Sequence, residues 1–331
     1  MGINSQHIDA VITWVDGNDQ QHYEKRRKIV DENKEIKESV LPTGKDNTRF
    51  VDNGELKYCL QSIRKFAPWI RTIHLVTDNQ RPDFLTEQYQ KENGIEFLNH
   101  QDIFSSYEWA LPTFNSRTIE TALWRIPDLS NHFIYFNDDF ILTSSVKPEH
   151  FFPDGKVLLR GKWNTIKNYG SVRLKINDII SILSKKILGI TRSMHLLQQI
   201  KSAQLAGFRN KYYRSPHVPH PIIKSSLAKF FSKNQESFQT NIQYKFRNVE
   251  QFSAIFLAHH IEISKGNTVL KKPDDFLILN GEMDLSFTLI PKLKKVKNGD
   301  AKFICLQGFE KYSRSNQKKI VEVLEDILES E

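Results

Sequence analysis

The feature that most constrains the fold is the alternation of short apolar, β-branched runs with stretches of helical periodicity over roughly the first 140 residues. The apolar runs lie at Ile8–Val15, Thr72–Val76, Ile95–Leu98 and His132–Phe136. Each has the length of a strand, and the run at Ile8–Val15 ends in a turn-forming cluster, as buried strands of parallel sheets do. The pattern therefore predicts an α/β fold with a mainly parallel, Rossmann-type sheet.

Helical periodicity fills intervals between these runs and returns toward the C-terminus. Leu56, Leu60 and Ile63 recur at helical spacing, with Asn53 placed as the N-cap. Ser116 is placed as the cap of a helix that carries Ile119, Ala122, Leu123 and Ile126. Three further helices are predicted, at Ser225–Phe231, Val249–His260 and Gln317–Leu328.

Residues 156–214 interrupt the alternation and hold most of the positive charge. They contain 13 lysines and arginines and one acidic residue, Asp178, in a chain whose net charge is +8. One amphipathic helix is predicted around Ile176–Ile190. We expect three parts: an α/β core at 1–155, a basic helical insertion at 156–214, and a remainder at 215–331 that ends in helices. The insertion is either a solvated surface or a contact for nucleic acid, anionic lipid or a phosphate-rich polymer.

The sequence has few features that would indicate a membrane-spanning, secreted or disulfide-bonded protein. No stretch approaches the roughly 18 apolar residues that span a bilayer, and no secretory signal is visible at the N-terminus. The two cysteines, Cys59 and Cys305, form no CxxC pair, which excludes a disulfide framework and argues against a zinc site built from cysteines. These features predict a cytoplasmic protein.

A carboxylate pair follows the apolar run at 132–136. Asn137-Asp138-Asp139 begins where that strand is expected to end, and ligands of open α/β sheets bind outside the carboxyl ends of the strands. Adjacent carboxylates repel unless a cation lies between them, and such oxygens suit Mg²⁺ or Mn²⁺ bound together with substrate phosphates. The alternative is a solvated turn, because aspartate is common in turns.

A second acidic turn follows the first apolar run. Asp16 and Asp19 flank Gly17, which allows a tight turn, and this arrangement is equally consistent with an ordinary connection. If the first and fourth strands are neighbours, both acidic turns project from one edge of the sheet, and four carboxylates share a cleft. The glycine-rich phosphate loops of dinucleotide folds and P-loops are missing from the sequence, so a nucleotide would be held differently.

Two histidines lie between prolines in His217-Val218-Pro219-His220-Pro221. This extended presentation suits a site, since histidine removes a proton from an attacking hydroxyl near neutral pH. Arg247 is the candidate partner that neutralises charge on a transferring phosphoryl group. A structural role for each histidine is the alternative.

Four blocks of the sequence together resemble the Stealth family of sugar-phosphate transferases, which includes bacterial capsule enzymes. The first is Ile8–Asp19, with its Trp14-Val15-Asp16-Gly17-Asn18-Asp19 turn, and the fourth is Lys302–Leu306. The second comprises Arg49–Tyr58, Arg64–Trp69, Leu111–Ser116 and Asn137–Asp139, and the third runs from His217–His220 to Arg247. The fourth departs from the family pattern, because Gln307-Gly308 stands where members often carry Asn-Asp, so no site is assigned there.

The resemblance implies a GT-A-like core that binds a UDP-sugar with Mg²⁺ or Mn²⁺ and transfers a hexose or N-acetylhexosamine 1-phosphate to a hydroxyl of a capsular or cell-surface polysaccharide. UMP would be released and a phosphodiester formed. It implies His217 as catalytic base and Arg247 as phosphate ligand, with Asp138 and Asp139 on the metal and Asp16 and Asp19 as weaker metal candidates. The expected donor pocket comprises Trp14, Asp16, Gly17, Arg49, Asn53, Glu55, Arg64, Asn115, Ser116 and Asn137.

The acceptor would be a polysaccharide or a lipid-linked oligosaccharide, which brings the protein to the inner face of the cell membrane. Two other classes remain open. An ordinary glycosyltransferase would use the same aspartates but release UDP, and a non-enzymatic nucleic-acid-binding protein would need the basic charge and not the carboxylates.

Overall fold

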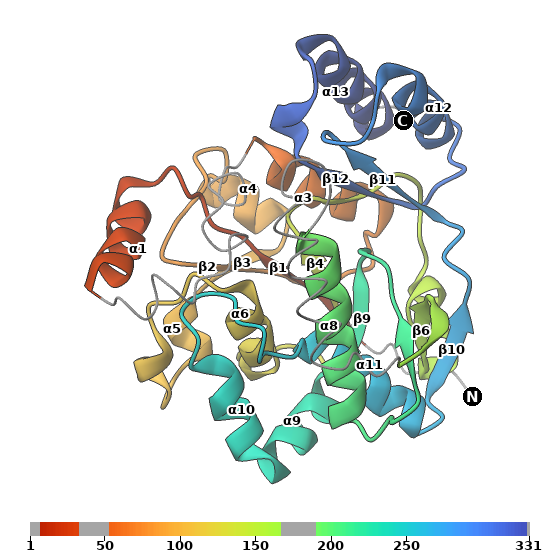
Figure 1. Cartoon of the computed structure of the whole chain (residues 1–331). Helices are drawn as coiled ribbons and strands as arrows, with labels where there is room; N and C mark the ends of the chain where they lie inside the picture. The colour runs from red at the N-terminus through yellow and green to blue at the C-terminus, as the bar shows by residue number, and fades with distance from the viewer. Residues whose placement is uncertain (1–6, 33–52, 167–189, 330–331) are drawn as a thin grey trace.

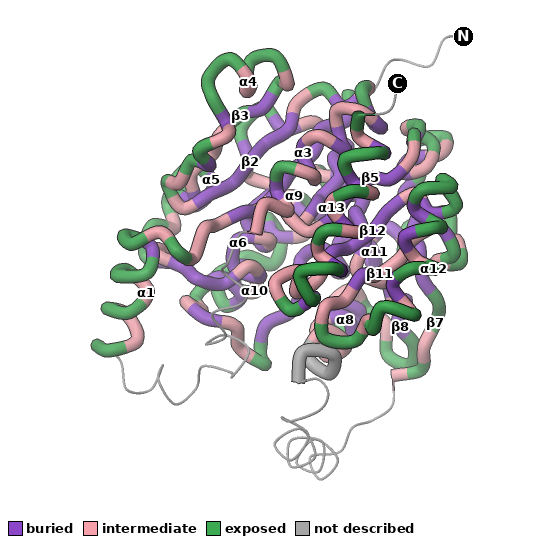
Figure 2. Tube along the Cα trace, turned by 90° about the horizontal axis from the view of Figure 1, so that it is seen from above, coloured by how far each residue is buried: buried purple, intermediate pink, exposed green. Residues whose placement is uncertain are grey.

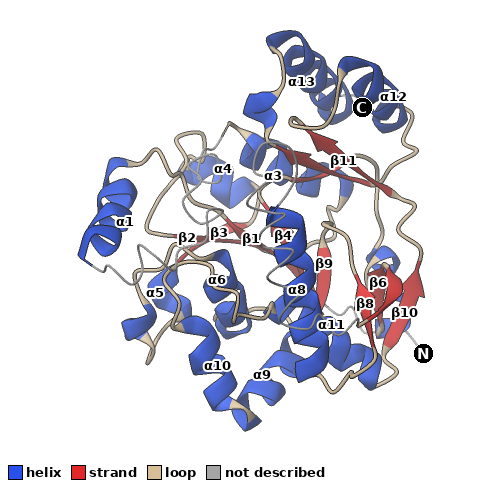
Figure 3. Cartoon of the chain, in the orientation of Figure 1, coloured by secondary structure: helices blue, strands red, loops and turns tan. Residues whose placement is uncertain are grey.

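The computed structural model describes residues 7–32, 53–166 and 190–329. Within these residues the central sheet has the strand order β3-β2-β1-β4-β9. Figure 3 shows its strands in red, with helices on both sides. The strands are β1 (Ile8–Thr13), β2 (Ile73–Thr77), β3 (Ile95–Asn99), β4 (His132–Asn137) and β9 (His220–Ile223). The first four run parallel, and β9 pairs antiparallel with β4 at the sheet edge. The predicted α/β class and mainly parallel sheet are confirmed.

Both faces of this sheet are covered, because successive side chains of each strand enter different cores. On β4, Ile134 and Phe136 join a core shared with the second sheet, whereas Phe133 and Tyr135 join a core on the other face. The first core includes α3 (Glu55–Phe66) and α13 (Arg314–Glu329); the other includes α6 (Ser116–Ala122), α9 (Lys224–Lys233), α10 (Gln235–Ile242) and α11 (Ala254–Ser264). Figure 1 shows these two groups of helices on opposite sides of the sheet.

A second sheet continues from the end of β4. Its order is β11-β12-β5, with β11 at Phe276–Asn280, β12 at Phe303–Gln307 and β5 at Phe140–Leu142. Since β5 starts right after Asp138-Asp139, and Cys305 of β12 pairs with Phe140, the C-terminal part of the chain lies against the β4–β5 turn. Helix α12 (Ser286–Lys297) packs with α13.

The remaining elements lie around these two sheets. The strand pair β6 and β10 is parallel, and the pair β7 and β8 is antiparallel. The bounds are α1 (Gln20–Glu32), α4 (Glu87–Glu92), α5 (His100–Ile103), α8 (Ile190–Leu205), β6 (Val157–Arg160), β7 (Lys162–Thr165), β8 (Lys211–Arg214) and β10 (Thr268–Lys271), with 3₁₀ turns at 108–110, 123–125, 148–150, 153–155 and 309–311. Figure 2 shows the buried path of β2 and the exposed residues of α1 and α12.

Both predicted helix caps are wrong by one residue. The N-cap of α3 is Gly54, whose φ of 93° lies in the left-handed region that glycine adopts without strain, and not Asn53. The N-cap of α6 is Asn115, whose side chain accepts from the backbone nitrogen of Arg117, so that Ser116 is the first helical residue. In each helix the neighbouring residue supplies the backbone conformation or hydrogen bond that starts the helix.

The helix predicted at Val249–His260 begins later than its apolar pattern suggests, at Ala254. The preceding residues are held in a loop because Gln251 hydrogen-bonds the side chains of Asn115 and Thr118 and the carbonyl of Asn241. The prediction at Ile176–Ile190 lies outside the described residues, except that α8 starts at Ile190. None of the helices in the described part of the chain has the length and apolar character that crossing a bilayer demands.

The division at 155 and 214 stays a prediction. Strand β9 of the third predicted part belongs to the same sheet as β1 and β4 of the first, and β10 pairs with β6. The third part therefore completes sheets that the first begins, whatever the boundaries of the insertion between them.

Candidate active site

Several polar side chains meet at the carboxyl edge of the central sheet. Thr13 at the end of β1 is in register with Asn137 at the end of β4, so the two strands are neighbours and both acidic turns follow them at one edge of the sheet. A cleft shared by the four carboxylates stays a prediction. His217 precedes β9, whose His220 is in register with Tyr135 of β4, and the chain therefore reaches the same edge. The N-terminus of α6 faces this edge as well, because a helix that leads into a parallel strand runs against the strand direction.

Asp139 lies at the centre of this arrangement. The Cys305 thiol donates to its Oδ2 at 3.1 Å, and His217 Nε2 lies 3.9 Å from the same oxygen. Its Oδ1 is buried and has no hydrogen-bond partner. Burial raises the pKa of Asp139 to about 7; the Cys305 hydrogen bond opposes this change and the charge of Glu55 adds to it. Burial thus disfavours the charged form of this carboxylate, and a cation at Oδ1 would offset that unfavourable free energy.

His217 presents a nitrogen suited to accept a proton. Asn137 Nδ2 lies 3.1 Å from Nε2 and can only donate, so in this arrangement Nε2 is the unprotonated ring nitrogen. The edge of the ring packs against Phe140 at a centroid distance of 4.6 Å, and the side chain is 28% exposed. The histidine is therefore fixed in orientation while an acceptor hydroxyl can still reach it.

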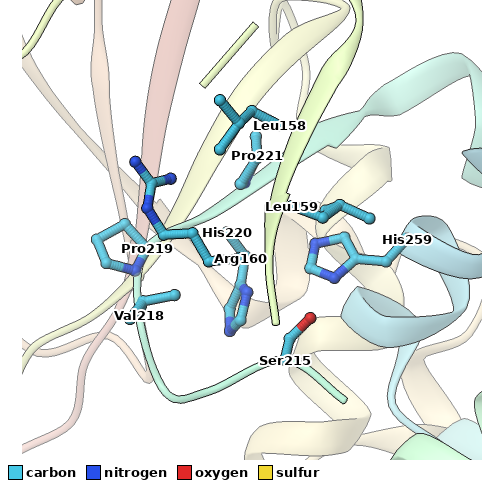
Figure 4. A pocket seen from close by; sticks show the side chains of 9 residues that line it. All are labelled: Leu158, Leu159, Arg160, Ser215, Val218, Pro219, His220, Pro221 and His259. Atoms are coloured by element: carbon cyan, nitrogen blue, oxygen red, sulfur yellow. The ribbon is translucent and has the colours of Figure 1, made fainter. Parts of the chain in front are cut away.

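His220 faces the interior instead. It is buried, packs against Phe256 and His259, and has a pKa well below the ordinary value because burial disfavours its charged form. With Ser215 and His259 it lines a small cavity of about 10 Å³ (Figure 4), about the space of one water molecule. The Ser215 hydroxyl and both ring nitrogens of His259 are buried there without partners. This surrounding favours a structural role for His220.

Arg247 lies at the start of α6. Its Nη2 donates to Ser116 Oγ at 2.6 Å. The loop that carries it is attached to the helix through Asn115, whose amide donates to the Tyr244 carbonyl at 3.0 Å and to Gln251 Oε1 at 2.8 Å. Asn115 is fully buried, so its role is to hold this loop, while the half-buried Arg247 and Ser116 are the polar groups that face outward.

The acidic turn after β1 has its own backbone partners. Asp16 Oδ1 accepts from the Asn18 backbone nitrogen at 2.8 Å, beyond Gly17. Asp19 Oδ1 accepts from the His22 backbone nitrogen at 2.7 Å at the start of α1. These carboxylates shape the turn, and their metal role stays a prediction, as does that of Asp138. Burial together with the charges of Asp138 and Asp139 raises the pKa of the Cys59 thiol, which places both carboxylates near it.

The other predicted donor-pocket residues are scattered. Trp14 is in the core and 5% exposed. Asn53 donates to Glu55 through its backbone and side-chain nitrogens, and Glu55 acts electrostatically on Asp139. Arg64 donates to the carbonyls of Ile70 and Gly94, which precede β2 and β3, so it lies at the opposite, amino edge of the sheet, where we assign it a structural role. Arg49 lies outside the described residues.

Cys305 and His195 were not anticipated from the sequence. Cys305 lies in the fourth block, but nothing in the chain before β12 indicates that this strand returns to the β4–β5 turn. His195 of α8 lies 6.1 Å from His217 between ring centroids, and burial lowers its pKa to about 4. The strand-like run at 302–306 was the available signal for Cys305.

The donor set fits a divalent cation. Among the described residues, the ligand atoms of Asp139, His217 and Cys305 all lie within 4.8 Å of one another. The unpartnered Asp139 Oδ1, with the adjacent Asp138, supplies the carboxylate oxygens that Mg²⁺ or Mn²⁺ prefers. The thiol and imidazole are softer donors than those ions need.

Comparison with known proteins identifies the family to which this chain belongs. Residues 6–34 match the family model for Stealth protein CR1, conserved region 1, and residues 49–158 match that for CR2, conserved region 2. A capsular polysaccharide phosphotransferase, WcwK of Streptococcus pneumoniae, is 30% identical, with 80% of this chain and 81% of the relative covered. The chain belongs to the Stealth family.

Two further relatives are also capsular polysaccharide phosphotransferases. The capsular polysaccharide phosphotransferase fcs1 of Haemophilus influenzae is 32% identical over 80% of this chain and 67% of its own length, and cps1A of Actinobacillus pleuropneumoniae is 32% identical over 89% and 76%. The matched family regions end before His217, so its catalytic role in this Stealth protein stays a prediction. Among solved structures, a galactosyltransferase, LgtC, aligns over 96% of this chain and 95% of its own with 10% identity and a TM-score of 0.43.

Proposed function

We propose that this protein transfers a sugar 1-phosphate from a UDP-sugar to a hydroxyl of a capsular or cell-surface polysaccharide and releases UMP. Its named relatives are capsular polysaccharide phosphotransferases, so the group that they move contains phosphorus. The observation that carries the proposal is the pairing of His217 Nε2 with Asp139 at the carboxyl edge, 3.9 Å apart. A base and a half-buried carboxylate at this edge suit an attack by a hydroxyl on phosphorus.

The acceptor oxygen forms a bond to the β-phosphorus of the donor, and the bond from that phosphorus to the oxygen bridging the two phosphates breaks. The acceptor proton passes to His217 Nε2, where the acceptor hydroxyl takes the place of the hydrogen bond that Asn137 Nδ2 makes in this structure. Arg247, held by Ser116, contributes positive charge toward the phosphoryl oxygens. The sugar keeps its bond to the β-phosphate, so its anomeric configuration is unchanged.

Asp138 and Asp139 would hold Mg²⁺ or Mn²⁺ against the donor diphosphate, with Asp16 and Asp19 as weaker candidates. When bound, such a cation neutralises charge that develops on the phosphate oxygens. Asp139 is suited to this because its Oδ1 is buried without a partner. Glu55, which lies close enough to act on Asp139, adds negative charge beside the same position.

The released nucleotide tests the proposal. Purified protein is incubated with a panel of UDP-hexoses and UDP-N-acetylhexosamines, an acceptor oligosaccharide and Mg²⁺, and the products are separated by chromatography. We expect UMP, together with a phosphodiester signal in the phosphorus NMR spectrum of the oligosaccharide. Release of UDP with a plain glycosidic bond would instead identify an ordinary glycosyltransferase.

We also propose that the basic insertion meets an anionic partner, either the phosphate-bearing product chain or the inner membrane surface. Not all of its charge is available, since Arg160 is buried against Asp275 at 2.8 Å and Lys201 pairs with Glu250 at 2.9 Å. Neutralising Lys162, Arg209 and Lys211, which are exposed, together with Lys156, is expected to weaken binding to anionic liposomes or acceptor, more at low salt than at high salt. Unchanged binding at every ionic strength identifies a solvated face.

A further inference from the structure

Three donor atoms of different chemistry converge beside the catalytic base. Cys305 Sγ lies 3.1 Å from Asp139 Oδ2, and His217 Nε2 lies 3.9 Å from the same oxygen. All three atoms fall within 4.8 Å of one another. They come from β12, from the β4–β5 turn and from the segment before β9, so the folding of the two sheets brings them together.

This donor set suits a softer ion than Mg²⁺. A thiolate and an imidazole favour Zn²⁺, Co²⁺ or Cd²⁺, whereas Mg²⁺ and Mn²⁺ favour oxygen ligands. With Zn–S near 2.3 Å and Zn–N near 2.0 Å, neighbouring ligands of a tetrahedral site lie roughly 3.3 to 3.6 Å apart. The Sγ–Oδ2 and Nε2–Oδ2 distances, 3.1 and 3.9 Å, lie on either side of that value. Small side-chain movements would therefore complete three corners of a tetrahedron.

An ion can reach these atoms from solvent. The side chains of His217 and Asp139 are 28% and 22% exposed, while Cys305 is 1% exposed and forms the inner end of the group. The other cysteine, Cys59, is also buried nearby, but its Sγ donates to the Asn137 carbonyl at 3.7 Å and it is outside the group. The chain thus contains a matched cysteine that lacks the metal-binding geometry.

We propose that Asp139, His217 and Cys305 form a binding site for a soft divalent cation such as Zn²⁺ or Cd²⁺, and that its occupation inhibits the enzyme. On binding, the Cys305 S–H bond breaks, its proton passes to solvent and an Sγ–metal bond forms. The ion occupies His217 Nε2, so this nitrogen can no longer accept the proton of the acceptor hydroxyl. The inhibitory part rests on the proposed function, whereas the site itself does not.

Absorbance tests the site without any assay of transfer. The full chain is titrated with Cd²⁺ and with Co²⁺ while the near-ultraviolet thiolate-to-metal charge-transfer band is recorded. We expect a band that saturates at one ion per chain, persists in Cys59→Ser and is lost in Cys305→Ser. If Cys305→Ser fails to fold, Cys305→Ala is used in its place, because alanine puts no hydroxyl in the core. No band in the wild-type protein, or a band that survives loss of Cys305 and disappears with Cys59, overturns the proposal.

Kinetics test the consequence. Zn²⁺ is expected to inhibit UMP release in the presence of excess Mg²⁺, and Cys305→Ser, compared with its own uninhibited rate, is expected to need at least about tenfold more Zn²⁺, equivalent to about 1.4 kcal/mol of binding free energy. Equal sensitivity of the two proteins contradicts the inhibitory role. If no UDP-sugar supports turnover but the Cys305-dependent band is present, the proposed function fails and the metal site stands.

Discussion

Two carboxylates, one near the start of β1 and one just after the end of the neighbouring strand β4, show how differently the two edges of the sheet are built. Asp9, near the start of β1, accepts from Arg71 at 2.9 and 2.7 Å and from the Ser130 backbone nitrogen at 2.7 Å. Although burial acts against it, hydrogen bonds from His74, Arg71 and Ser130 hold its pKa well below the usual range. Asp139, just after β4, has one thiol donor and an unpartnered oxygen, and burial raises its pKa to about 7.

The Asp9 carboxylate stabilises the folded state, and its pKa is lowered. The Asp139 carboxylate is placed where burial disfavours its charged form, and its pKa is raised. At the amino edge Arg71 pairs with Asp9, and Arg64 donates to the loops before β2 and β3, so the Asp9 carboxylate finds its partners within the chain. At the carboxyl edge Asp139 Oδ1 has no hydrogen-bond partner within the chain, and a bound ligand would supply one. Replacing each aspartate with asparagine should therefore affect stability at Asp9, on the amino edge, and catalysis at Asp139, on the carboxyl edge.

The largest effect is expected from Asp139→Asn. Loss of the charge that holds the divalent cation should lower turnover by roughly 10³-fold or more, since a metal contributes several kcal/mol to phosphoryl transfer. The melting temperature should stay the same or rise, because a half-buried carboxylate with one unpartnered oxygen loses its charge. EDTA should reproduce the loss in the wild-type protein. Full activity of the variant, or of the wild type in EDTA, contradicts the metal role.

His217→Ala should lower turnover by about 10² to 10⁴-fold with donor affinity largely kept, as expected for loss of a general base. His220→Ala should cost less rate and more stability, since His220 packs in the interior against Phe256 and His259. Initial rates of UMP release are measured for both variants after their melting temperatures are compared. An active His217→Ala beside an inactive but folded His220→Ala reverses the assignment.

Arg247→Ala should reduce turnover by about 10² to 10³-fold, because a cationic contact that strengthens in the transition state is lost. Ser116→Ala is the matched control: it removes the hydroxyl that holds the guanidinium but leaves the charge, so a smaller loss is expected. Steady-state kcat and KM are measured for both. An Arg247→Ala variant with normal kcat and only a raised KM shows that the arginine contributes to binding alone.

Asp9→Asn should have the smallest effect on catalysis and a clear effect on stability. Its hydrogen bonds to charged partners are worth about 1.5 to 3 kcal/mol, and Arg71, 40% exposed, regains water when they weaken. Because the folded pKa of Asp9 is lowered, its contribution is present above the unfolded pKa and is lost as pH falls below it. Urea unfolding at pH 7 should separate wild type from variant, and the difference should shrink toward pH 3. A variant that loses activity per folded molecule contradicts the division between the edges.

The sequence predicts the central sheet well and the second sheet not at all. Strands β1, β2 and β4 are recognisable because burial on both faces requires continuous apolar runs, and the edge strand β3, in which only Ile95 is buried, keeps a shorter run. Strand β5 has only three residues and pairs with β12 across more than 130 residues, as Phe140 does with Cys305, and no local pattern carries that information. The helix caps failed for a different, local reason: Gly54 starts α3 through a left-handed backbone, and Asn115 starts α6 by accepting from the Arg117 backbone nitrogen.

For the site, the sequence identified the chemistry better than the geometry. The Asp138-Asp139 turn and the proline-bounded His217 were visible as motifs, and the structure brings Asp139 and His217 to 3.9 Å. Trp14, Asn115 and Arg64 were assigned to the donor pocket through the family resemblance, and that assignment stays a prediction. In the structure Trp14 lies in the core, and Asn115 and Arg64 donate to loop carbonyls. Residues of one motif can serve the fold or the reaction, and three-dimensional contacts are needed to distinguish the two.

The most direct test of the account follows the β-phosphate of the donor. A UDP-sugar labelled with ³²P at the β-position is incubated with the wild-type protein, Mg²⁺ and acceptor, and the polysaccharide is separated from nucleotides. Transfer of sugar 1-phosphate predicts label in the polysaccharide and unlabelled UMP in the nucleotide fraction, with neither formed by His217→Ala at a comparable rate. Label that remains entirely on UDP while sugar enters the polysaccharide contradicts the account.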